Sequence, residues 1–198
     1  MLVEPISEHA PLSSRQVTAD DVLEVLRRLD EARVDWWIDG GWGVDALLGK
    51  ETRPHDDLDL AVRRAHIERL ETAFAEFVRT RDEWPASFVL IDPRGRQIDI
   101  HPIEIDDRGN GWQERPDGRK DIWPHEALAG HGRIGDREVR CTTVEWQIKS
   151  HLYPSHDDID RRDIQLLCER FGVAPPSAPW PGAIHPKRVR ARSIPGIS

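Results

Sequence analysis

The sequence has few cysteines and no long apolar segment. Cys141 and Cys168 are the only cysteines among 198 residues, too few for a disulfide framework and not spaced as a Cys-x-x-Cys motif. No apolar run approaches the roughly 20 residues that a membrane-spanning helix needs, and the N-terminal stretch lacks the apolar region of a signal peptide. We therefore expect a cytoplasmic protein without a membrane partner.

An excess of positive charge is also missing. Lys and Arg number 28 against 36 Asp and Glu, which gives a formal net charge of −8. A nonspecific nucleic-acid-binding protein needs a basic surface, so this balance argues against a nucleic-acid partner. It suits a small cationic substrate, although the charge of a whole chain says little about one site.

The most informative stretch runs from Gly40 to Val62. Within it, apolar residues alternate with Asp57 and Asp59, which is the period of a strand with one buried face. The two carboxylates therefore point the same way, roughly 6.6–7 Å apart along the chain, where their charges repel each other and resist burial. A hard divalent cation such as Mg²⁺ relieves both costs. The alternative for a bare Asp-x-Asp is an acidic edge strand in solvent.

The surroundings of the two acids favour the metal site. Residues 35–39 predict a short strand, and Gly40 and Gly41 follow at once. Paired glycines let the backbone approach a ligand closely and present N–H groups to phosphate. Arg53 and His55 come just before the acidic strand, where they can meet phosphate oxygens. For Arg53 the alternative is an ordinary surface charge.

Two later strands carry further polar residues. Residues 87–92 and 96–101 predict a hairpin around a Pro-Arg-Gly turn. Asp99 alternates with apolar neighbours on the returning strand, so its carboxylate can project toward the other two acids. His101 lies on the same face, where it can orient Asp99 or meet a substrate. The alternatives are a strand-face carboxylate paired with an arginine and a structural histidine.

Periodicity predicts the remaining elements. Helices are expected after a Thr18 cap at 19–32, at 42–48 before Gly49, at 66–80, and from Thr143 onward. A hairpin is expected at 131–140, with a strand at 139–141 extending the sheet. Arg162 and Asp163 are expected to pair structurally rather than to act in catalysis.

One long segment is expected to be a loop. Residues 106–121 are polar and rich in glycine, and loops of this length in a compact domain are usually functional or mobile. Trp112 within it is a candidate apolar contact over an acceptor site, and an exposed flexible loop is the alternative.

Composition divides the chain into four parts. These are a leader at 1–16, a core domain at 17–142, a helical part at 143–173 and an irregular proline-rich tail at 174–198.

Three motifs together resemble one enzyme family. They are Trp-Ile-Asp-Gly-Gly-Trp-Gly-Val-Asp at 37–45, Leu-Gly-Lys at 48–50 and His-x-Asp-x-Asp at 55–59. The pattern resembles the antibiotic nucleotidyltransferases of the polymerase-beta-like superfamily, which include lincosamide nucleotidyltransferases and aminoglycoside 2''-adenylyltransferases. The resemblance runs from about Val22 to Phe171. It implies an α/β (α+β) fold with a mixed-sheet polymerase-beta-like core and C-terminal helices.

The resemblance also implies roles for individual residues. Mg²⁺, as two ions, is expected on the acids Asp57, Asp59 and Asp99, with Asp99 as the third acid and general base. A nucleoside triphosphate, with ATP expected, is the co-substrate. Its expected contacts are Gly40, Gly41, Arg53, His55 and Lys149 of the helix after the sheet. An exposed helical lysine is ordinarily just solvated. The expected substrate contacts are His101 and Trp112.

The implied function is Mg²⁺-dependent transfer of AMP to a hydroxyl of a small-molecule antibiotic or metabolite. A lincosamide-like acceptor is favoured, because the segment from Leu90 to Gly118 matches those enzymes best. An aminoglycoside is the alternative, since an acidic protein would welcome a polyamine. Two further alternatives are a toxin-type nucleotidyltransferase, which would want a basic surface, and a non-catalytic nucleotide-binding regulator, against which the three acids count. A homodimer is an open alternative for the assembly.

Overall fold

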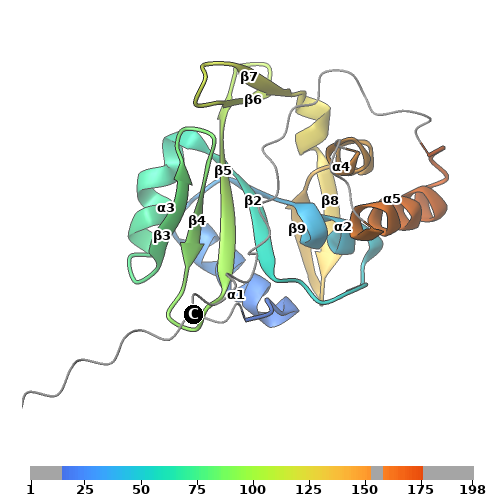
Figure 1. The fold of residues 1–198 in the computed structure, drawn as a ribbon, viewed down its shortest axis with the longest axis horizontal. Coiled ribbons are helices and arrows are strands. Elements are labelled where there is room, and N and C mark those ends of the chain that lie inside the picture. The colour runs from blue at the N-terminus through green and yellow to red at the C-terminus, as the bar shows by residue number, and fades with distance from the viewer. Residues whose placement is uncertain (1–14, 153–157, 176–198) are drawn as a thin grey trace, which may run out of the picture.

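A mixed β-sheet forms the centre of the molecule (Figure 1). The computed structural model describes residues 15–152 and 158–175. Within these residues, seven strands follow the order β3-β4-β5-β2-β1-β9-β8, and a β6–β7 hairpin continues from β5. The strands are β1 (Trp36–Asp39), β2 (Asp57–Arg63), β3 (Val78–Glu83), β4 (Ser87–Ile91), β5 (Gln97–Ile105), β6 (Gly111–Glu114), β7 (Lys120–Trp123), β8 (Gly130–Ile134) and β9 (Arg137–Cys141).

Helices flank this sheet and end the described chain. The helices are α1 (Ala19–Glu31), α2 (Gly40–Leu48), α3 (Ile67–Ala73), α4 (Val144–His151) and α5 (Asp158–Phe171), with short 3₁₀ turns η1 (Arg64–His66) and η2 (His125–Leu128). Figure 1 shows α2, α4 and α5 grouped on the side of β8 and β9. The mixed sheet with C-terminal helices confirms the predicted fold class. None of the helices in the described ranges is both long and apolar enough to cross a membrane.

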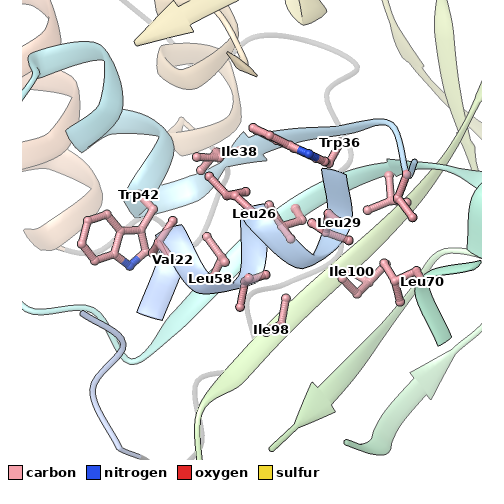
Figure 2. Packing of buried hydrophobic residues seen from close by; sticks show 14 of the residues in the cluster. Val22, Leu26, Leu29, Trp36, Ile38, Trp42, Leu58, Leu70, Ile98 and Ile100 are labelled. Atoms are coloured by element: carbon pink, nitrogen blue, oxygen red, sulfur yellow. The ribbon is translucent and has the colours of Figure 1, made fainter. Parts of the chain in front are cut away.

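The main hydrophobic core lies between one sheet face and helices α1 and α3. Leu58 of β2 and Ile98 and Ile100 of β5 point into it, and Leu26 and Leu29 of α1 pack over them (Figure 2). All five side chains are nearly inaccessible to solvent. Because strand residues alternate between faces, the acids at 57, 59 and 99 must lie on the opposite face. The core therefore fixes which side of the sheet carries charge.

Helix α1 is held by its cap and by one buried arginine. The predicted Thr18 cap is present, and Asp21 completes it as a reciprocal capping box. Arg96, 3% exposed, donates to Asp92 at 2.6 Å and to Asp21 at 2.9 Å. Since Asp21 lies on α1 and Asp92 directly follows β4, this arginine ties the helix to the hairpin that carries Asp99.

Close packing also fixes α2 against the edge hairpin β8–β9. A Cβ added at Gly132 of β8 would lie 2.4 Å from the backbone carbonyl of Ala46 in α2. Only glycine allows this approach. The hairpin at 131–140 and the pairing of β9 with β1 are confirmed, as are the hairpin of β4 with β5 and the left-handed Gly49 that ends α2.

Two predicted elements are wrong. The helix expected over 66–80 ends at Ala73, and residues 78–83 form strand β3 on the edge of β4. Apolar residues recur at helical spacing over 67–78, but Val78 is 62% exposed, and pairing with the backbone of β4 outweighs this local pattern. The loop expected over 106–121 contains strand β6 and the start of β7. Turn residues around Gly118 explain the polar composition that concealed this hairpin.

The predicted domain boundaries remain predictions. The leader at 1–16 and the tail at 174–198 lie almost wholly outside the described residues.

Replacing Arg96 tests the tie between α1 and the β4–β5 hairpin. Arg96→Met should lower the free energy of unfolding by roughly 3 kcal/mol, because buried Asp21 and Asp92 lose their buried cation and keep only the more exposed Arg15 and Arg94. The hydrogen bonds from Thr18 and Arg96 outweigh burial and lower the pKa of Asp21, and Arg96 does the same for Asp92. The difference should therefore be full above pH 4 and shrink below it. Urea denaturation measures it.

Arg27→Met is the matched control. Arg27 pairs with Glu31 on the exposed side of α1, and its loss should change stability by less than about 0.5 kcal/mol. Equal effects of the two substitutions would contradict the role given to Arg96.

Candidate active site

Strand register brings three aspartates side by side. Asp39 of β1 pairs with Asp59 of β2, and Asp59 pairs with Asp99 of β5. Residues in register point to the same face of a sheet, and Asp57, two residues before Asp59, shares that face. The structure therefore brings together the three predicted acids and adds a fourth, Asp39, which the sequence analysis missed. We call these four carboxylates, Asp39, Asp57, Asp59 and Asp99, the acid row.

The carboxylates of this row disturb one another electrostatically. Asp59 is only 7% exposed. Burial, together with the neighbouring charge of Asp59, raises the pKa of Asp99 to about 6. Such a shift means that the metal-free site holds more negative charge than its surroundings solvate.

His101 adds a compensating group. Its Nε2 lies 3.6 Å from Oδ1 of Asp59. Burial disfavours the charged imidazole, but the carboxylate of Asp59, helped by those of Asp39 and Asp99, outweighs it and raises the pKa of His101. The sequence analysis left open whether His101 orients Asp99 or meets a substrate, and the structure pairs its ring instead with the carboxylate of Asp59.

Two glutamines support the acid row, one directly and one through His101. Gln97 donates to Oδ1 of Asp99 at 3.0 Å. Gln113 of the β6–β7 hairpin is fully buried, and its Nε2 lies 3.4 Å from Nδ1 of His101. The hairpin that replaced the expected loop thus reaches the acid row through one side chain.

The donor set suits Mg²⁺. Carboxylate oxygens are the ligands that this ion prefers, and the raised pKa of Asp99 indicates a charge excess that a cation would relieve. Within the described ranges, no three His, Cys, Asp or Glu side chains already converge tightly enough to enclose an ion. Mg²⁺ does not require such a cage, because it keeps waters and takes phosphate oxygens of a nucleotide alongside one or two carboxylates.

Helix α2 begins directly beside this row. Gly40, its first residue, has φ +60°, a conformation that other residues adopt at a cost. A Cβ on Gly41 would lie 2.5 Å from the Arg53 guanidinium and 2.6 Å from the His55 ring. Gly41 therefore lets Arg53 and His55 approach the start of the helix.

Arg53 and His55 are themselves tied into a buried network. His55, 2% exposed, bonds Asp45 of α2 at 2.6 Å, and Arg53 donates to Asp163 of α5 at 3.0 Å. Asp163 thus has a structural ion pair, but its partner is Arg53 and not the neighbouring Arg162 that was expected, because α5 turns Asp163 inward beside Leu167. The nucleotide contacts predicted for Arg53 and His55 remain predictions, and the observed bonds give both residues a supporting role.

The two other predicted contacts lie apart from the acid row. Lys149 has its ammonium 4.8 Å from the ring centre of Trp146 and lines a cavity of about 420 Å³ between η2, α4 and the chain after α5. Trp112 pairs with Glu104, so the alternation along β5 places it on the face opposite His101. Both assignments remain predictions, and the register gives no support to Trp112.

Asp39 and its partners Thr142 and Gln147 are the residues that sequence reasoning missed. Thr142 donates to Asp39 at 2.9 Å, and Gln147 donates to Thr142 at 2.7 Å. Strand β1 is buried along its whole length, so no alternation marked Asp39 as facing the site. Its position directly before Gly40 was the one available signal.

Comparison with known proteins agrees with this geometry. The family model described as aminoglycoside-2''-adenylyltransferase matches residues 21–167, most of the chain. The chain belongs to this family. The antibiotic nucleotidyltransferases that it joins are enzymes of the polymerase-beta-like superfamily, as the motifs around Asp57 and Asp59 indicated.

Relatives of two kinds share the family. A lincosamide resistance protein of Staphylococcus haemolyticus is 27% identical over 158 residues, which are 79% of this chain and 98% of the relative. A 2''-aminoglycoside nucleotidyltransferase of Klebsiella pneumoniae is 32% identical over 145 residues, 72% of this chain and 76% of the relative.

Solved structures of both kinds share the fold. The lincomycin-bound crystal structure of the lincosamide antibiotic adenylyltransferase LnuA has a TM-score of 0.70 at 27% identity, covering 77% of this chain and 98% of that one. The structure of ANT(2")-Ia in complex with adenylyl-2"-tobramycin has a TM-score of 0.61 at 23% identity, covering 77% and 88%.

The charge excess at Asp99 leads to a stability prediction. Its folded-state pKa lies above the unfolded value near 4, so ionisation costs the folded state increasingly between pH 4 and 6 and fully above pH 6. Asp99→Asn should therefore raise the melting temperature of the metal-free protein by a few degrees at pH 8 and leave it unchanged at pH 4. Calorimetry in EDTA measures both values.

Asp56→Asn is the control for this substitution. Asp56 is an exposed neighbour of the acidic strand, and its replacement should be nearly neutral at both pH values. A lower melting temperature for Asp99→Asn at pH 8 would show that Asp99 is not strained by its neighbours.

Proposed function

We propose that this protein transfers AMP from ATP to a hydroxyl of a small-molecule antibiotic, with Mg²⁺ as cofactor. The observation that carries the proposal is the register of Asp59 with Asp99, on the face that also holds Asp57. A carboxylate pair facing the start of a helix, where N–H groups attract phosphate, suits phosphoryl chemistry. Membership in the family favours this enzyme over the regulator and toxin-type alternatives.

In the proposed site Asp57 and Asp59 hold the cation, with Asp99 as a further ligand. Mg²⁺ at such a site offsets the charge of the phosphates and of the attacking and leaving oxygens. Glycines 40 and 41 present backbone N–H groups to the triphosphate, flanked by Arg53 and His55. Lys149 remains a candidate phosphate contact that would have to leave Trp146.

Asp99 is the proposed general base. Its register with Asp59 supports this role, because it puts the Asp99 carboxylate on the face of the proposed metal acids. It accepts the proton of the acceptor hydroxyl. The hydroxyl oxygen forms a bond to the α-phosphorus, the bond from that phosphorus to the bridging oxygen breaks, and pyrophosphate leaves. His101, beside Asp59, is placed to contact the acceptor or to hold the carboxylate row.

A lincosamide is the favoured acceptor. The chain spans 98% of the lincosamide resistance protein but 76% of the aminoglycoside enzyme, and the greater structural similarity is to the lincomycin-bound enzyme. An aminoglycoside is the second candidate. The 32% identity supports it, as does the net charge of −8, which would attract a polyamine.

Mass spectrometry tests the reaction and the acceptor together. The protein is incubated with Mg²⁺, ATP and either lincomycin or tobramycin, and a mass gain of one AMP on lincomycin is expected. A gain on tobramycin alone would move the acceptor to the aminoglycosides. If neither drug gains mass, panels of further lincosamides and aminoglycosides are tested. No gain on any member of these panels would overturn the proposed acceptor class.

Substitution of the metal acids tests the mechanism. Asp59→Asn should lower the rate of AMP transfer by more than about 100-fold, since loss of even an outer partner of a metal ligand costs 10–100-fold. The exposed Asp56→Asn variant should keep its rate. Near-full turnover by Asp59→Asn with an unchanged melting temperature would contradict the metal role.

A further inference from the structure

Asp39 occupies the N-cap position of α2 but does not cap the helix. Its backbone is extended, with φ −123° and ψ −175°, which is the conformation of a capping residue. An aspartate here ordinarily accepts hydrogen bonds from the N–H groups two and three residues on, in this chain Gly41 and Trp42. Its side chain makes no such bond within the described chain.

A buried hydrogen-bond chain holds the carboxylate elsewhere. Thr142 Oγ1 donates to Oδ1 of Asp39 at 2.9 Å, and Gln147 Nε2 donates to Thr142 Oγ1 at 2.7 Å. Thr142 and Gln147 are fully buried, and the Thr142 backbone is fixed by a bond to the carbonyl of Ile38. The carboxylate is therefore drawn toward β9 and α4, away from the helix axis.

A glycine in α2 makes room for this chain. A Cβ added at Gly43 would lie 2.1 Å from Gln147 Nε2. A side chain at position 43 would displace the glutamine that supports Thr142. Helix α2, helix α4 and the end of β9 are thus shaped around the position of one carboxylate.

We propose that Thr142 and Gln147 are positioning residues for nucleotide binding, because they hold the Asp39 carboxylate off the first turn of α2. The N–H groups of that turn then stay available to the triphosphate, beside the Arg53 guanidinium that packs on Gly41. A carboxylate released from Thr142 would cap the helix and compete with phosphate for the same donors. This inference rests on the proposed function, which places a nucleoside triphosphate at α2.

Binding of a non-hydrolysable nucleotide tests the inference. Thr142→Val keeps the shape of the side chain and removes the hydroxyl, so the dissociation constant for α,β-methylene-ATP with Mg²⁺ should rise on the order of tenfold, the usual scale of a helix cap. Thr142→Ser should stay near wild type. Thr143→Val is the matched control, because Thr143 makes no side-chain cap bond to α4. Isothermal titration calorimetry gives each constant.

Removing Asp39 supplies the decisive comparison. The double variant Asp39→Ala with Thr142→Val should return to within about threefold of the wild-type affinity, because the competing carboxylate is gone. A structural role for Thr142 would give no such rescue. Affinity unchanged in Thr142→Val, or still lost in the double variant with its melting temperature preserved, would overturn the inference.

Should Thr142→Val fail to fold, Gly43→Ala and its combination with Asp39→Ala provide the same comparison. Their expected affinities are the same as those of the Thr142→Val variants, since the added Cβ displaces Gln147. Failure of the wild-type protein to bind the nucleotide at all would instead contradict the proposed function. The two failures are therefore distinguishable.

Discussion

Repulsion between carboxylates held in register is the constraint on which the rest of the site depends. Parallel pairing of β2 with β5 places Asp59 beside Asp99, and antiparallel pairing with β1 places Asp39 beside Asp59. The apolar contacts of Leu58, Ile98 and Ile100 on the other face hold the strands in this register. A one-residue slip of β2 would turn Asp57 and Asp59 into the apolar core, so burial of the core residues fixes the face that carries the acids.

The surrounding elements then serve to contain that charge. His101 and Gln97 contact the row directly, and Thr142 anchors its outermost member. On the next layer, Arg53 links the segment before β2 to Asp163 of α5. Buried polar groups therefore join α5 to the segment before β2, in addition to the apolar packing of the C-terminal helices.

The sequence predicted the parts of this arrangement that depend on local pattern. Alternation around Asp57 and Asp59, the hairpin that carries Asp99 and the capped helix α1 all have short-range signals, and all are confirmed as elements. The features that the sequence could not predict depend mostly on contacts between residues far apart in the chain. Strand β3 exists because β4 offers an unpaired edge, the β6–β7 hairpin was hidden by its turn residues, and Asp39 faces the site only through its pairing with β2.

The β6–β7 hairpin has a consequence for how such an enzyme diversifies. It follows β5 beyond the acids and stands at one end of the molecule (Figure 1). Its side chain Gln113 reaches the acid row through the ring of His101. Gly118 in its turn has φ +79°, which disfavours other residues, but an added Cβ meets nothing within 4 Å, so changes elsewhere in the turn leave the acid row untouched. The length and sequence of this turn can therefore change without altering the strand register that puts Asp59 beside Asp99.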